Sequence, residues 1–185
     1  MEVKGIALKT TRDFVRTNFH GEYSKWLREL PDATRNMYED VIDMTVWYPL
    51  REAYLIPIET ITRMFFKGNA QECGHTLGYY SAEVALKGIY KVFLLIASPN
   101  FLIQRASKII TTYYRPSQVE AFTISPKSAA IRITEFSEMD LALEYRFGGW
   151  CKRALELSNC KGVKYAIRKS IVKGDAHTEI EFSWE

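Results

Sequence analysis

The sequence predicts an α+β fold, in which an N-terminal helical bundle packs on a small C-terminal antiparallel sheet of about four strands, with a long helix between the strand pairs. Two observations predict it. Apolar residues recur at helical spacing through the first two thirds of the chain, and they alternate with polar residues after residue 118. The 185 residues show no repeat and no linker, so one domain over 1–185 is expected.

Glycine and proline divide the first helical region. An amphipathic stretch runs from Thr11 to Leu30 and ends at Pro31. Asp32 is expected to cap the next helix, because its carboxylate can accept free amides of the first turn. A longer helix should follow Trp47-Tyr48-Pro49, and Pro57, which lacks an amide donor, should kink or restart it.

The second helical region extends from Ala70 to Tyr113. Helical spacing continues to Ala97, with Gly88 as a possible division into two helices. Ser98-Pro99 is typical of a helix start, and an amphipathic helix is expected after it.

After residue 118 the apolar residues recur at every second position, which is the spacing of a β-strand. Val119 to Ile124 and Ala129 to Thr134 predict a hairpin around Ser125-Pro126-Lys127-Ser128. Strands are also expected near Val163 to Val172 and over Thr178 to Trp184, where apolar and polar residues alternate as in a half-buried strand.

The long helix is expected from about Met139 to Ser158, although Gly148 and Gly149 lie in its middle. Each glycine should cost about 1 kcal/mol relative to alanine. The simplest compensation is the close approach of another backbone, such as a strand lying across the missing side chains.

Composition excludes several classes of protein. Apolar residues make up 47% of the chain, which indicates a globular protein. The net charge of +3 comes from interspersed charges, so no nucleic-acid partner is expected. The longest apolar run, 92–97, is too short to span a membrane. Cys73, Cys151 and Cys160 are odd in number and irregularly spaced, which favours reduced thiols and a cytoplasmic location.

Three segments carry a resemblance to known domains. Trp47-Tyr48-Pro49-Leu50, followed by a helix, resembles a bacterial paralogous family of unassigned function. Gly149 to Leu157 resembles the long helix of several members of the superfamily that contains haem-NO-binding, 4-vinyl-reductase and Golgi-transport-particle (TRAPP) domains. Lys173 to Ile180 resembles the tight turn and final strand of TRAPP and 4-vinyl-reductase domains. The resemblance covers nearly the whole chain.

The resemblance implies where haem would be held, and the sequence departs from the family there. Haem-NO-binding domains ligate iron through one histidine on the helix before the hairpin and grip the propionates with a Tyr-x-Ser-x-Arg motif. That histidine position falls near Ile109, and the second hairpin strand, Ala130 to Phe136, lacks the motif. Without an axial ligand haem would be held by packing alone, so no cofactor is expected.

The resemblance also points to two other sites. Many 4-vinyl-reductase domains carry metal-binding cysteines beside the Gly-Asp turn, where this chain has Ser170 and Thr178, with His177 as the only soft ligand nearby. Zinc generally needs three or four such ligands, so no metal is expected. Some TRAPP subunits carry an acyl chain on a cavity cysteine, and Cys73 lies on a helix of that general kind.

No pattern of catalytic residues appears. The three histidines, His20, His75 and His177, are isolated, and Cys73 and His75 are two residues apart on a helix, so their side chains do not face each other. The sequence has no phosphate-binding glycine loop, zinc-protease motif or paired acids. We therefore expect no enzyme.

Two functions are weighed. The first is a non-enzymatic interaction or regulatory module in bacterial signalling, working as a homodimer or with a protein partner; surplus aromatics favour it, since interfaces enrich them. They are Trp47, Tyr48, Tyr79, Tyr80, Tyr113 and Tyr114. The alternative is a sensor that binds a small apolar ligand, without haem ligation, in a cavity of roughly 300 Å³ between the helices at 70–114 and the sheet. The candidate ligand-binding residues are Leu77, Tyr80, Val84, Ile109, Tyr113 and Trp150.

Overall fold

The computed structural model describes residues 1–86 and 98–185. Its helices are α1 (Gly5–Asn18), α2 (Tyr23–Glu29), α3 (Asp32–Glu39), α4 (Ile56–Phe65), α5 (Ala70–Ala85), α7 (Pro99–Tyr113) and α8 (Leu141–Leu157). Short helical turns lie at His20–Glu22, Arg51–Leu55 and Ile171–Lys173. The strands are β1 (Glu2–Lys4), β2 (Trp47–Pro49), β3 (Tyr114–Arg115), β4 (Gln118–Ser125), β5 (Ser128–Glu135), β6 (Lys164–Lys169) and β7 (Thr178–Ser183).

The C-terminal strands form a four-stranded antiparallel sheet in the order β4-β5-β7-β6, with α8 between the two strand pairs in sequence. Ile180 of the central strand β7 pairs with Ile131 of β5 and with Ile167 of β6. Ile180 and Phe182 are buried while Glu179 and Glu181 are half-buried, as their alternation predicts. The α+β class, the hairpin, the long helix and the terminal strand pair are confirmed.

A second sheet, in the order β2-β1-β3, was not predicted. Val3 pairs with Tyr48 on one side and with Tyr114 on the other, so segments distant in the sequence meet there. Strands of two or three residues are too short to show an alternating pattern, and only the tertiary fold brings their edges together.

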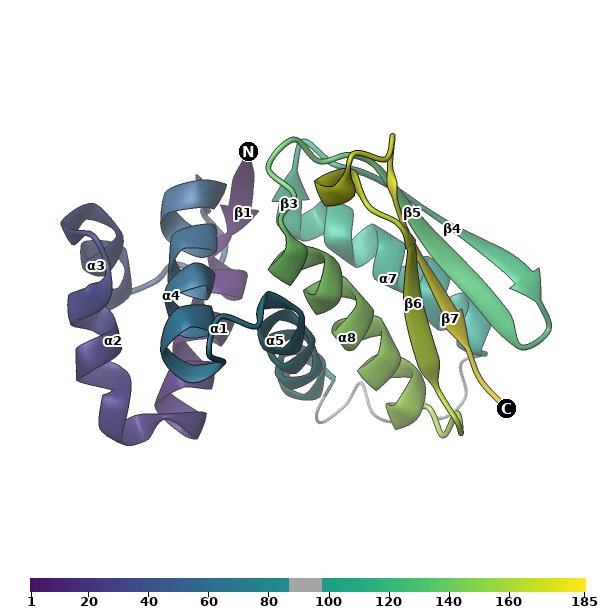
Figure 1. Cartoon of the computed structure of the whole chain (residues 1–185), viewed down its shortest axis with the longest axis horizontal. Coiled ribbons are helices and arrows are strands. Elements are labelled where there is room, and N and C mark those ends of the chain that lie inside the picture. Colours follow the sequence, from purple (N-terminus) through teal and green to yellow (C-terminus); the bar gives the residue numbers. More distant parts are fainter. Residues whose placement is uncertain (87–97) are drawn as a thin grey trace.

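The arrangement of layers also differs from the expected one. Figure 1 shows α1 to α4 on one side, the pair α5 and α8 in the middle, and the four-stranded sheet on the other side. The N-terminal helices α1 and α4 contact α5, whereas α7 and α8 contact the sheet. The N-terminal bundle therefore packs on a middle helical layer, because α7 and α8 already cover the apolar face of the sheet.

Several predicted boundaries shift. The first helix begins at Gly5 rather than near Thr11. Asp32 does not cap α3: it is the first helical residue, and its carboxylate lies 2.5 Å from the guanidinium of Arg35. The change expected at Pro57 is a transition between helix types without a break, because the π-helical turn Arg51–Leu55 runs directly into α4 and Pro57 occupies the first turn of α4.

The helix start at Ser98 is confirmed, because the Ser98 hydroxyl accepts a hydrogen bond from the Phe101 amide. The division expected at Gly88 lies outside the described residues. None of the described helices combines the length and apolar character needed to cross a membrane.

Candidate functional site

The helix before the hairpin is α7, and Ile109 lies on it, half-buried beside the buried Ile110. The sequence contains no histidine between His75 and His177. A branched aliphatic side chain cannot ligate iron, so α7 offers no axial ligand at this position. On β5, Arg132 forms an ion pair with Glu179 across the sheet, and both guanidinium nitrogens Nε and Nη2 bind the same carboxylate oxygen.

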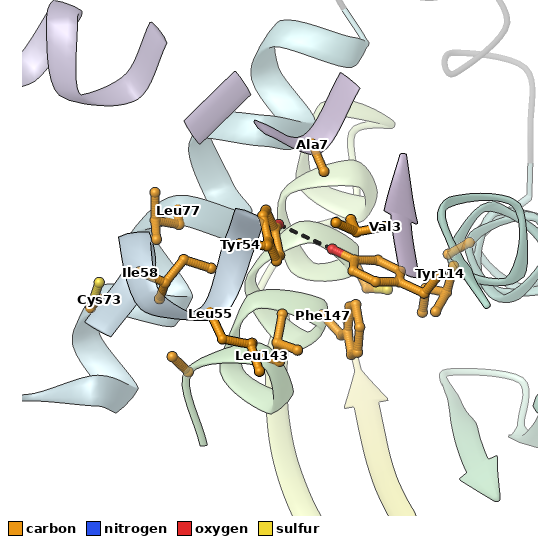
Figure 2. Packing of buried hydrophobic residues seen from close by; sticks show 14 of the residues in the cluster. Val3, Ala7, Tyr54, Leu55, Ile58, Cys73, Leu77, Tyr114, Leu143 and Phe147 are labelled. Atoms are coloured by element: carbon orange, nitrogen blue, oxygen red, sulfur yellow. Dashed lines mark hydrogen bonds between the residues drawn. The ribbon is translucent and has the colours of Figure 1, made fainter. Parts of the chain in front are cut away.

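The six predicted ligand-binding residues lie on three helices in different surroundings. Leu77 of α5 is fully buried near Ile58 and Cys73 (Figure 2). Tyr80 turns toward α1, where its ring packs edge-on against Phe14 at 5.3 Å. Val84 is 43% exposed, against the expectation that it faces inward. The remaining three are half-buried: Ile109, Tyr113 and Trp150.

A hollow of about 370 Å³ lies between α7 and β4. Its walls are formed by Gln104, Ser107, Lys108, Glu120, Ala121 and Phe122. It lies between a helix of the predicted region and the sheet, and it is an open hollow on the surface. None of the six predicted residues is among its described walls, and it carries charges of both signs at its rim.

The middle layer of the fold depends on glycine. A Cβ atom at Gly74 of α5 would stand 2.0 Å from the carbonyl oxygen of Ala142, and one at Gly149 of α8 would stand 2.4 Å from that of His75. The backbone approach expected at Gly149 is therefore confirmed, but the neighbour is a helix and not a strand. At Gly148 the neighbour is the ring of Tyr165 on β6, 2.3 Å from such an atom.

A charged side chain lies inside this layer. Arg146 of α8 is only 5% exposed, and its Nη2 donates to the Ser81 hydroxyl of α5 at 2.8 Å. Its guanidinium lies 5.1 Å from the ring centre of Tyr54. Its Nη1 has no hydrogen-bond partner in the described part of the chain. A buried charge that is incompletely bonded marks a candidate site.

Buried phenols surround the same region. Tyr114 donates a hydrogen bond of 3.0 Å to the hydroxyl of Tyr54, as the dashed line in Figure 2 shows, and Tyr38 donates to the carbonyl of Ala53. Burial raises the pKa of Tyr38, Tyr54 and Tyr114, although the charge of Arg146 works in the opposite direction. These three phenols therefore stay neutral at ordinary pH.

A second buried charged side chain occupies the region expected from 4-vinyl-reductase domains to bind metal. The carboxylate of Glu144 is fully buried and accepts hydrogen bonds from the hydroxyls of Ser170 at 2.8 Å and Thr178 at 2.5 Å. Ser170 and Thr178 thus bind a carboxylate of the chain itself. No group of three His, Cys, Asp or Glu side chains suited to a metal ion occurs among the described residues.

Glu144 and Arg146 were missed from the sequence. The available signal was their position: both are charged residues among apolar ones near the start of the long helix, within four residues of Gly148. Charged side chains among apolar residues of a helix are rarely buried without a partner. Charged residues in such a pattern are therefore candidates for a buried polar site.

Several of the aromatic residues that were expected at an interface make contacts within the chain instead. Arg115 and Lys4 lie over the Trp47 ring at 4.1 and 5.2 Å, and Arg153 lies over Tyr79 at 4.6 Å. Tyr114 is buried. Because these rings already have neighbours, they give little support to an interface.

The histidines and thiols show no catalytic pairing. His75 Nδ1 lies 3.0 Å from the Tyr165 hydroxyl, and burial lowers the pKa of His75, helped by Lys152. All three cysteines are free thiols. Burial raises the pKa of Cys73 to about 11 and that of Cys151 to about 12.

The helical N-terminal half, the middle helix pair and the hairpin and strand pair around α8 define an α+β domain of the haem-NO-binding (H-NOX) fold. An H-NOX protein from S. oneidensis in the Fe(II)NO ligation state has a similar structure, with a TM-score of 0.74 and 12% sequence identity over 98% of this chain and 99% of that one.

Other H-NOX structures agree. The Fe(II) unliganded H-NOX protein from K. algicida gives a TM-score of 0.70 at 13% identity, with 98% of this chain and 96% of that chain covered. A mutant structure of the T. Tengcongensis H-NOX gives 0.68 at 11% identity, with 98% and 97% covered. No family model and no curated protein matches the sequence. The haem-NO-binding part of the predicted resemblance is thus confirmed for the fold.

Proposed function

We propose that this chain is a non-enzymatic regulatory module in bacterial signalling, which acts by contact with a second copy of itself or with a partner protein. The observation that carries the proposal is the match to H-NOX proteins over 98% of the chain, combined with isoleucine at position 109. A domain that keeps the complete fold but lacks the expected iron ligand can still act by binding other molecules with its surface.

One surface supports contact with a protein. The loop between α3 and β2 exposes Val41 at 95%, Met44 at 46% and Val46 at 46%. It adjoins β2, an edge strand of the three-stranded sheet. Clustered exposed apolar side chains commonly mark interaction sites, and an edge strand offers unpaired backbone groups for a partner.

Native mass spectrometry of protein purified from its own host tests this proposal. We expect a dimer or a bound partner for the wild type, and a bare monomer for Val41→Asp. Val172→Asp is the matched control, because Val172 is equally apolar, 43% exposed and distant in sequence from the loop. A wild-type protein that appears as a bare monomer contradicts the proposal.

The second candidate function is a small-molecule sensor that works without haem iron, and the buried, incompletely bonded Arg146 favours it. The residues predicted to line its site remain Leu77, Tyr80, Val84, Ile109, Tyr113 and Trp150. An absorption spectrum of protein expressed with haem precursor tests the haem-free part. We expect no Soret band, and a band with stoichiometric iron would overturn it.

A further inference from the structure

Arg146 is the one buried arginine in the described part of the chain, and it has no carboxylate partner. Arg153 binds Glu83 at 2.5 Å, and Arg132 binds Glu179 at 2.7 Å. None of the ion pairs formed within residues 1–86 and 98–185 includes Arg146. Removing a guanidinium from water is costly, and an unpaired one costs most. Its charge therefore needs a counter-ion.

No carboxylate in the described part of the chain forms an ion pair with Arg146. The nearest acidic influence is Asp140, whose charge, like that of Arg146, acts on Tyr54 and Cys73, but its carboxylate caps α8 by accepting from the Leu143 amide.

Glu144 is two residues away from Arg146 on α8, so it points to a different side of the helix, and its two oxygens bind Ser170 and Thr178. The neighbouring phenols of Tyr54 and Tyr114 are neutral. The sequence over 87–97 contains no aspartate or glutamate.

One nitrogen of the guanidinium, Nη1, is buried and has no hydrogen-bond partner among the described residues. Ser81 donates its own proton to the Leu77 carbonyl at 2.7 Å, so its oxygen is free to accept from Arg146 Nη2. The ring of Tyr54 lies against the guanidinium. These contacts hold Arg146 in place while Nη1, shielded from solvent, has no partner among the described residues.

We infer that Arg146 binds a small monoanion inside the protein, at Nη1, between α5, α8 and the π-helical turn Arg51–Leu55. This inference rests on the sensor function and names the chemistry of its ligand: a halide, a small inorganic oxyanion such as nitrite, or a short carboxylate. A single negative charge neutralises the guanidinium, whereas a dianion would leave an excess charge in the interior. The buried position of Nη1 restricts the ligand to a small one.

Urea unfolding of the full chain in sodium chloride, nitrite or formate tests the site, with ionic strength held constant by sodium gluconate, whose anion is large. A ligand that binds only the folded state raises the folded-to-unfolded ratio about tenfold at about ten times its dissociation constant. We expect the free energy of unfolding to rise with the concentration of at least one of these anions and then to level off. The anion that produces this rise shows which chemical class the site binds.

Arg146→Met should abolish the anion response, and it should fold, because methionine fills similar space without a charge. Arg132→Met is the matched control: it removes an arginine that already has a carboxylate partner, so the response should persist. An equal anion response in Arg146→Met and in the wild type would overturn the inference.

A crystal of the wild type grown with sodium bromide gives a second readout that does not depend on a variant. An anomalous peak beside Arg146 Nη1 supports the site, and a crystal without that peak, together with no saturable stabilisation by any of the three anions, overturns it. The broader sensor function is separate: it survives if native mass spectrometry shows a retained neutral ligand.

Discussion

Gly78 on α5 and Arg146 on α8 lie backbone against backbone: a Cβ atom at Gly78 would stand 2.1 Å from the carbonyl oxygen of Arg146. No real side chain tolerates this distance, so the two helices touch there without intervening side chains. The same contact fixes the position of the Arg146 backbone relative to α5. The Arg146 side chain therefore reaches Ser81, near the C-terminal end of α5, and donates a hydrogen bond to it.

Gly78→Ala should therefore destabilise the protein. The helix itself would gain about 1 kcal/mol from alanine, but forcing the helices apart costs typically 1–3 kcal/mol and more for a backbone clash. We expect a net loss of free energy of unfolding of roughly 1–2 kcal/mol, measured by urea titration. The matched control is Gly21→Ala, because nothing lies within 4 Å of a Cβ atom there. Equal stability of Gly78→Ala and the wild type would refute the close contact.

Thr178→Val should also destabilise the protein, because it removes a hydrogen-bond donor to the buried carboxylate of Glu144 without changing the side-chain shape. A buried acceptor left without its donor costs about 1–3 kcal/mol. Thr123→Val on the exposed part of β4 is the control and should change the free energy of unfolding by less than about 0.5 kcal/mol. Equal free energies of unfolding for the two variants would show that the hydrogen bond from Thr178 to Glu144 does not stabilise the fold.

The thiols should differ in reactivity in the native protein. Cys160 is half-buried, whereas Cys73 and Cys151 are buried with pKa values of about 11 and about 12. Because the thiolate is the reactive form, a thiol reagent at pH 8 should modify one cysteine in the folded chain and three in urea. Cys160→Ser should abolish the native reaction. Rapid modification of Cys73 in that variant would contradict the buried position.

The ion pair of Arg132 and Glu179 should make the free energy of unfolding depend on pH in the acidic range. The hydrogen bond from Arg132 lowers the pKa of Glu179 below its ordinary value of 4.5. A lowered folded-state pKa gives stability that is complete above about pH 4.5 and is lost as the pH falls through the folded-state value. The partly exposed pair should contribute roughly 0.2–1 kcal/mol.

Unfolding of Glu179→Gln at several pH values measures this effect. Its difference from the wild type should be constant at neutral pH and should disappear in acid. Glu135→Gln, at an exposed carboxylate without an ion pair among the described residues, should show no such trend. A difference that persists below the transition would show that Glu179 acts through packing and not through its charge.

The sequence by itself determined the elements whose signals are local. The alternation of Ile180 and Phe182 with charged residues identified the last strand, and Ser98-Pro99 identified a helix start, because each signal acts within a few residues of backbone. It also determined that position 109 on α7 is isoleucine and that no histidine lies between His75 and His177, since these statements depend on residue type alone.

Tertiary structure alone decided what depends on distant partners. The sheet that joins Val3 to Tyr48 and Tyr114 has strands too short for any periodic signal. The pair of glycines Gly148 and Gly149 predicted a close neighbour but not that one neighbour would be a helix and the other a ring. The burial of Arg146 and Glu144 depends on which helix and strands pack against α8, because a charge is costly only where the fold removes water from it.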